Sequence, residues 1–126
     1  LLPGMPMIYY GDEVGMEGGP DPDCRRGMLW EEGRQKRDCL GYYRRLIQIR
    51  HRYPALTGGR IAAQYADDEK GILYVERELE EQRIILIFHV GEGSVQLSGP
   101  EGWRNLITEE GFSGRLGEYE AAVLVR

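Results

Sequence analysis

The stretch "QRIILIFHVG" at residues 82–91 decides the fold of this chain. Residues 84–90 form an almost continuous apolar run, which is typical of a strand covered on both faces. The polar "LEEQ" before it and the glycine after it are turn signals. We therefore predict that this stretch is the central strand of a sheet.

Shorter runs with the two-residue period of strands surround this stretch. They are separated by polar and glycine-containing turns, and regularly spaced short strands of this kind favour an antiparallel sandwich or barrel. The runs are "GRIAAQYA" (59–66), "GILYVERE" (71–78), "GSVQLSG" (93–99), "WRNLIT" (103–108) and "EYEAAVLVR" (118–126).

The period changes to that of a helix in residues 33–53. One apolar stripe recurs at spacings of three and four residues, and it consists of Leu40, Tyr43, Leu46, Ile47 and the stem of Arg50. Basic residues crowd the end of this segment, where the helix dipole favours them, and Pro54 ends it.

The first thirty residues combine an apolar run with a long loop. Residues 5–10 are typical of a buried strand, and "GMEGGPDPDCRRGMLWEEG" (15–33) follows as an irregular loop. A loop of roughly twenty residues is long for a connection, and long ordered loops are often functional. The chain opens at Leu1 with no strand ahead of residues 5–10, so we expect it to be part of a longer protein.

Composition narrows the function classes. The 126 residues carry a net charge of −5, which argues against a nucleic-acid partner. No apolar run approaches the length of a membrane span, so we predict a cytoplasmic protein without a membrane partner. Two cysteines, Cys24 and Cys39, and two histidines lack zinc-site spacing. We therefore assign no metal and no cofactor, and favour reduced cysteines while leaving one disulfide open.

Three motifs resemble one enzyme family. They are "LPGMPMIYYGDEVGM" (2–16), "GGPDPDCRRGMLW" (18–30) and "LIQIRHRYPAL" (46–56). Together they resemble the C-terminal third of glycoside hydrolase family 13, the α-amylase family, in its neopullulanase, cyclomaltodextrinase and maltogenic amylase branch. The resemblance implies two parts. Residues 1–57 would be strand 8, the active-site loop and helix 8 of a (β/α)8 catalytic barrel, and residues 58–126 a domain C-like antiparallel β-sandwich.

The loop contains a candidate sugar-binding pair, Asp21 and Arg25. They are four residues apart, so a helical turn would place their side chains on one face. A carboxylate beside a guanidinium suits the vicinal hydroxyls of a sugar, although the same pair could simply pin the loop. The resemblance associates both positions with glucose recognition, and we predict substrate binding by Asp21, Arg25 and the nearby Trp30. Arg26 is predicted to be structural.

No catalytic residue is predicted in this chain. Asp12 and Glu13 are carboxylates, but neighbouring residues of a strand point to opposite faces and cannot readily flank one bond. The resemblance implies that the nucleophile, the acid and the stabilising carboxylate lie on earlier barrel strands. We therefore expect this chain alone to be inactive.

The resulting prediction is the C-terminal part of a retaining α-glucan hydrolase. The parent enzyme would cut α-1,4 or α-1,6 glucosidic bonds in maltooligosaccharides, cyclodextrins, pullulan or starch. The expected partners are the glucan and the rest of the barrel. Exposed barrel-facing surface would lead residues 1–53 either to fold back on the sandwich or to mediate self-association. Two alternatives remain, a free-standing carbohydrate-binding or interaction module and a glucosyl-transferring member of the same family.

Overall fold

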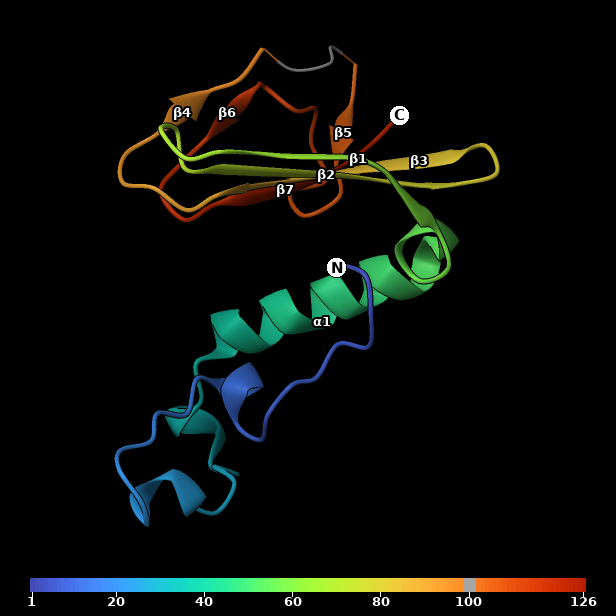
Figure 1. Ribbon diagram of the computed structural model, residues 1–126. Helices are drawn as coiled ribbons and strands as arrows, with labels where there is room; N and C mark the ends of the chain where they lie inside the picture. The colour runs from blue at the N-terminus through green and yellow to red at the C-terminus, as the bar shows by residue number, and fades with distance from the viewer. Residues whose placement is uncertain (99–101) are drawn as a thin grey trace. The chain divides into compact units, whose positions relative to one another are not determined.

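The computed structural model describes residues 1–98 and 102–126, and most of its regular structure is antiparallel β (Figure 1). One helix, α1 (Arg37–Arg52), precedes the strands. The strands are β1 (Arg60–Asp67), β2 (Ile72–Leu79), β3 (Gln82–His89), β4 (Val95–Gln96), β5 (Arg104–Asn105), β6 (Arg115–Leu116) and β7 (Ala121–Val125). Gly99, at the end of one predicted strand, lies outside the described residues.

The main sheet has five strands in the order β1-β2-β3-β7-β5, and β4 and β6 pair as a separate ribbon (Figure 1). All pairs are antiparallel. β3 is the middle strand, so the prediction from its apolar run is confirmed. The predicted strands 93–99 and 103–108 shrink to two residues each within the described chain.

Both faces of the sheet are covered, and β3 shows why. Its residues 84–87 are all buried. Ile84 and Leu86 belong to one hydrophobic cluster and Ile85 and Ile87 to the other. Side chains alternate between the faces of a strand, so a strand covered on both sides needs a continuous apolar run. The first cluster also contains Ile49, Ala55, Leu56, Val75, Leu106 and Val123, and the second Ile72, Trp103, Leu116, Ala122 and Leu124.

Helix α1 ends close to the predicted residue 53 but begins later than the predicted residue 33. Its buried residues also differ from the predicted stripe. Ile49, outside the predicted stripe, is 4% exposed, whereas Ile47 is 43% exposed. Pro54 follows the helix as expected and opens a single 3-10 turn, η4 (Pro54–Leu56). This turn buries Ala55 and Leu56 completely. The end of the helix is therefore anchored by the residues that follow it.

Residues 5–9 form no strand. Met5 is 94% exposed and Met7 83% exposed, and residues 12–14 form a 3-10 turn, η1 (Asp12–Val14). A strand needs hydrogen-bonded neighbours, and none of the described segments pairs with this one. The strand expected over residues 5–10 is thus not formed here. Its assignment to a barrel stays a prediction.

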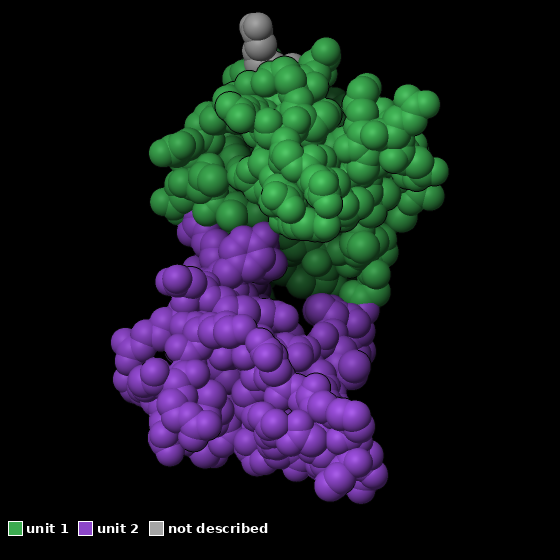
Figure 2. Space-filling model, turned by 90° about the vertical axis from the view of Figure 1, so that its left-hand side faces the viewer, with its two compact units in different colours: residues 1–4, 49–126 green, residues 5–48 purple. Residues whose placement is uncertain are grey.

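The chain divides into two compact units (Figure 2). One contains Leu1–Gly4 with Ile49–Arg126, and the other contains Met5–Gln48. The first four residues belong with the sheet because Arg50 donates a hydrogen bond from Nη2 to the Gly4 carbonyl at 2.8 Å. The division into barrel and sandwich at residue 57 stays a prediction. Within the described ranges, no helix has the length and apolar character needed to cross a bilayer.

Candidate functional site

Asp21 and Arg25 lie side by side in the long loop. A 3-10 turn, η2 (Asp23–Arg25), brings them together, and Arg25 Nε is 2.9 Å from Asp21 Oδ1. Arg25 Nη2 also donates a hydrogen bond to Asp21 Oδ2 at 3.4 Å. The side chain of Arg25 is 75% exposed and that of Asp21 is 61% exposed, so both remain open to solvent. The predicted proximity is confirmed, and sugar binding by the pair stays a prediction.

Asp23 and Arg26 form a second and tighter pair beside the first. Arg26 donates from Nε to Asp23 Oδ1 at 2.5 Å and from Nη2 to Oδ2 at 2.6 Å. The Gly19 backbone N–H donates to Oδ2 at 2.8 Å. The hydrogen bonds from Arg26, and then the one from Gly19, lower the pKa of Asp23. This carboxylate is therefore held in its charged form.

Further contacts tie the loop to the rest of its unit. Arg26 Nη1 approaches the Glu17 carbonyl at 3.5 Å, and the Glu17 carboxylate pairs with Lys36 at 3.1 Å. The Tyr10 hydroxyl donates to the Cys24 carbonyl. Arg26 thus has the structural role that the sequence predicted. The contacts of Asp23, Glu17 and Tyr10 were not predicted, because they depend on the path of the loop.

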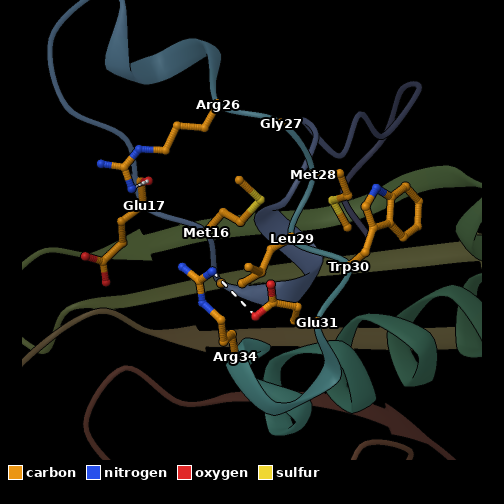
Figure 3. A pocket seen from close by; sticks show the side chains of 10 residues that line it. Met16, Glu17, Arg26, Gly27, Met28, Leu29, Trp30, Glu31 and Arg34 are labelled. Carbon is orange, nitrogen blue, oxygen red and sulfur yellow. Dashed lines mark hydrogen bonds and ion pairs between the residues drawn. The ribbon is translucent and has the colours of Figure 1, made fainter.

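Trp30 lies in a pocket of about 420 Å³ formed by residues 15–17, 26–31 and 34 (Figure 3). The indole is 79% exposed. Met16, Met28 and Leu29 provide apolar surface, while Arg34 and Glu31 form an ion pair at 3.6 Å. Such a mixture of apolar and charged groups suits a polar ligand with apolar faces. Neither Asp21 nor Arg25 lines this pocket, so the three predicted substrate residues are not brought into one cavity.

Asp12 and Glu13 lie in η1 rather than in a strand. Consecutive residues of a 3-10 turn are about one third of a turn apart, so their side chains still diverge. Asp12 Oδ2 accepts a hydrogen bond from the Tyr9 backbone N–H at 3.1 Å, which is a local structural role. Glu13 Oε2 is buried without a hydrogen-bond partner. That the two are not a catalytic pair stays a prediction.

A polar cluster on the sheet is a feature that sequence analysis missed. Glu76, 8% exposed, accepts hydrogen bonds from Arg83 Nη2 at 2.8 Å and from the Tyr74 hydroxyl at 3.0 Å. Arg83 also lies over the ring of Trp103, with its guanidinium carbon 5.7 Å from the centroid. Tyr65 stacks on Tyr74 with centroids 4.8 Å apart. Desolvation, and then the hydrogen bond to Glu76, raise the pKa of Tyr74 to about 12.

His89 and the two cysteines have structural surroundings. His89 is 4% exposed, and its Nδ1 lies 2.6 Å from the Gly117 carbonyl, as expected for a satisfied buried histidine. Cys24 and Cys39 are both free thiols. In the part of the chain that the structure describes, no group of three or more histidine, cysteine or acidic residues could hold a metal ion.

Comparison of this chain with known proteins gives matches among curated sequences and among solved structures. No family model matches it. It is 38% identical over 121 residues to neopullulanase 2 of Thermoactinomyces vulgaris, covering 91% of this chain and 21% of that protein. It is 35% identical over 115 residues to the cyclomaltodextrinase of Geobacillus thermopakistaniensis (strain MAS1), covering 87% and 20%. The structure of the maltogenic amylase from S. marinus matches 94% of this chain and 16% of that chain, with a TM-score of 0.79 and 27% identity.

These matches share one class, the α-glucan hydrolases, and the chain corresponds to the C-terminal part of such enzymes. The chain belongs to glycoside hydrolase family 13, the α-amylase family. It spans about a fifth of the length of the curated relatives it matches.

Proposed function

We propose that this chain supplies a substrate-contacting loop and a supporting sandwich to a retaining α-glucan hydrolase. The enzyme would act on α-1,4 or α-1,6 glucosidic bonds of maltooligosaccharides, cyclodextrins, pullulan or starch. The observation that carries the proposal is the exposed pair of Asp21 and Arg25 in the long loop. Its Oδ1 and Nε atoms lie 2.9 Å apart. The names of the two curated relatives agree with this class of substrate.

The chemistry of this pair fits two neighbouring sugar hydroxyls. A guanidinium has five N–H donors, and Arg25 directs only Nε and Nη2 at Asp21, so donors remain for a ligand. The Asp21 carboxylate has further lone pairs that can accept hydrogen bonds from hydroxyls. One hydroxyl would thus accept from Arg25 while its neighbour donates to Asp21. Charge-assisted hydrogen bonds of this kind are stronger than neutral ones.

Trp30 is the proposed aromatic contact of the same loop. Its exposed indole offers a flat apolar surface to the C–H face of a sugar ring, and the charged groups around it offer hydrogen bonds to hydroxyls. Since Trp30 and the pair of Asp21 and Arg25 do not share a cavity, we expect them to contact different sugar units of one oligosaccharide.

We further propose that catalysis needs carboxylates that this chain does not supply. A retaining glycosidase holds an acid and a nucleophile about 5–5.5 Å apart on either side of the bond. The general acid must be protonated at working pH, whereas the hydrogen bonds from Arg26 lower the pKa of Asp23. Asp23 is therefore unsuited to act as the acid. The remainder of the barrel would supply the acid and the nucleophile.

The proposal is tested by titrating the ¹⁵N-labelled chain with maltotriose. We expect chemical-shift changes in residues 21–30 and a weaker affinity for maltotriose in the Asp21→Ala variant. The same preparation should release no reducing sugar from pullulan or cyclodextrin. Absence of any shift in the loop at saturating sugar, or hydrolysis by the chain alone, would contradict the proposal.

A second candidate function is sugar binding by the sheet itself. Tyr65 is 56% exposed and stacks on Tyr74, which presents an aromatic surface on the β1 edge of the sheet. In this case the shift changes would cluster around Tyr65, and Tyr65→Ala would abolish them. Tyr119→Ala is the matched control, because Tyr119 is 70% exposed but stands outside the strands.

A further inference from the structure

We propose that Asp23 and Arg26 are positioning residues that hold Asp21 and Arg25 in their sugar-binding arrangement. This inference rests on the proposed function. The two pairs interleave within six residues, Asp21 with Arg25 and Asp23 with Arg26. Residues 21–26 thus contain two carboxylates and two guanidinium groups that could pair in more than one way. The structure has only one of these pairings.

Asp23 has the better-satisfied carboxylate of the two. It accepts two hydrogen bonds from Arg26, at 2.5 and 2.6 Å, and one from the Gly19 backbone at 2.8 Å. Bidentate pairing of a guanidinium with a carboxylate fixes orientation as well as distance. Asp21, by comparison, accepts a longer hydrogen bond from Arg25 Nη2 on Oδ2 at 3.4 Å, and its Oδ1 lies 2.9 Å from Arg25 Nε and 3.8 Å from Cys24 Sγ. Asp23 therefore holds Arg26, and Asp21 stays open to a ligand.

We call Asp23, Arg26 and the Gly19 N–H the clamp. The backbone of residues 18 and 19 lies close to η2 and makes room for it. A Cβ atom added to Gly19 would lie 2.8 Å from Asp23 Oδ2, and one added to Gly18 would lie 3.2 Å from the Cys24 Cα. A side chain at residue 19 would thus force the Asp23 carboxylate to shift, and one at residue 18 would make a tight contact with the backbone of Cys24. The clamp joins residues 18–19 to residues 23–26 and closes the base of the turn that presents Asp21.

Loss of the clamp would free a competing cation. Without the Asp23 charge, Arg26 keeps only its 3.5 Å contact with the Glu17 carbonyl. A second guanidinium, only one residue from Arg25, could then compete for Asp21 and block its open lone pairs. Clamping Arg26 therefore keeps Asp21 available to sugar hydroxyls.

The test compares maltotriose affinity by NMR titration in the wild-type chain, Asp23→Asn, Gly19→Ala and Asp67→Asn. Asp23→Asn removes the charge, while Gly19→Ala displaces the carboxylate and leaves its charge. We expect each to weaken maltotriose binding at least about fivefold. Asp67→Asn is the matched control in the other unit. Asp67 likewise pairs with a cation three residues ahead, Lys70 at 3.3 Å, and accepts its backbone N–H. It should leave affinity within about twofold.

A double-mutant cycle separates positioning from general loop damage. If Asp23 acts through Asp21, Asp23→Asn should have no further effect on residual binding in the Asp21→Ala background. Unchanged affinity in Asp23→Asn and Gly19→Ala, or an equal effect in both backgrounds, would overturn the inference. Failure of the proposed function looks different, because the wild-type chain itself would then show no binding, and the inference would fall with it.

Discussion

Arg77 is a cation buried inside the sheet unit, with 2% of its surface exposed. Its Nη2 donates to the Gly59 carbonyl at 2.6 Å, but Nε and Nη1 are buried without hydrogen-bond partners. Desolvation, followed by the nearby charge of Arg50, lowers the pKa of Arg77. A buried charge with two unused donors opposes folding.

Arg77→Met is therefore expected to stabilise the chain. The change removes the desolvation cost and keeps a side chain of similar length, so the free energy of unfolding should rise by about 1–3 kcal/mol. Urea unfolding followed by tryptophan fluorescence measures this. Arg83→Met is the contrasting control and should destabilise, because it leaves the buried carboxylate of Glu76 without its guanidinium. A loss of stability in Arg77→Met would contradict the prediction.

Tyr74 makes stability depend on high pH. Its pKa is raised to about 12 in the folded chain, by desolvation and by the hydrogen bond it donates to Glu76. A raised pKa means that the stabilisation is fully present below the unfolded-state pKa, about 10, and is lost as pH rises through the folded value. We expect stability to fall between about pH 10 and 12, and to fall less in Tyr74→Phe. Equal alkaline denaturation curves for the two proteins would contradict this.

The connection between η4 and β1 depends on one glycine. A Cβ atom on Gly59 would lie 2.3 Å from the Ala55 carbonyl oxygen and 2.8 Å from that of Glu78. Both are backbone atoms, which cannot turn aside as a side chain can. The neighbouring Gly58 has no atom closer than 4.0 Å to such a Cβ. The close approach at Gly59 is what joins the buried η4 to the first two strands.

Gly59→Ala should lower the free energy of unfolding by about 1–3 kcal/mol or more, since the clash forces the backbone to move. Gly58→Ala, one residue away, should change it by no more than about 0.5–1 kcal/mol. Thermal unfolding of the two variants in parallel measures the difference. Similar stabilities for both would show that the connection tolerates a side chain at either place.

At the scale of the whole molecule, the unit Met5–Gln48 has several large apolar side chains that are exposed. Met5, Met7 and Tyr9 are 94%, 83% and 59% exposed, and Trp30 is 79% exposed. Contiguous exposed apolar surface commonly marks an interaction site. The backbone of residues 5–8 belongs to none of the described sheets, so it could also pair with another chain.

We therefore expect the isolated chain to self-associate. Light scattering over a concentration series should give an average mass above that of one chain, and Met5→Ser combined with Met7→Ser should lower it. Arg115→Ser is the control. Arg115 is exposed but belongs to the sheet unit, so this change should not alter the average mass. A monomer at every concentration would contradict the prediction.

Much of the sheet was predictable because its signals are local. The two-residue period predicted β1, β2 and β7, and the apolar run of β3 predicted the central strand. β6 was missed, because a strand of two residues has no period to detect. The buried face of α1 differs from the predicted stripe. Ile49 is buried because it packs in one cluster with η4 and the sheet, and the spacing of apolar residues along the helix does not reveal such contacts. The strand predicted over residues 5–10 needs neighbours that the described chain does not provide.

The candidate site also has one part that local spacing predicted and one part that it did not. A spacing of four residues predicted that Asp21 and Arg25 would meet, because a helical turn places such residues on one face. Arg26 could have paired with Asp21, Asp23 or Glu17, and spacing alone does not choose among them. The loop path chooses Asp23, since the Gly19 N–H and the narrow approach at Gly18 and Gly19 fix the turn.

The sequence by itself determined the order of helix and strands, the central place of β3 and the proximity of Asp21 to Arg25. Each follows from the repeat of side chains along a single element, which is a local property. Three features are visible only in the folded chain: the clamp on Asp23, the buried Arg77 and the pocket lined by Trp30. Each of these features depends on the path of a loop or on packing across a sheet. The spacing of residues along the sequence predicts neither the loop path nor the packing.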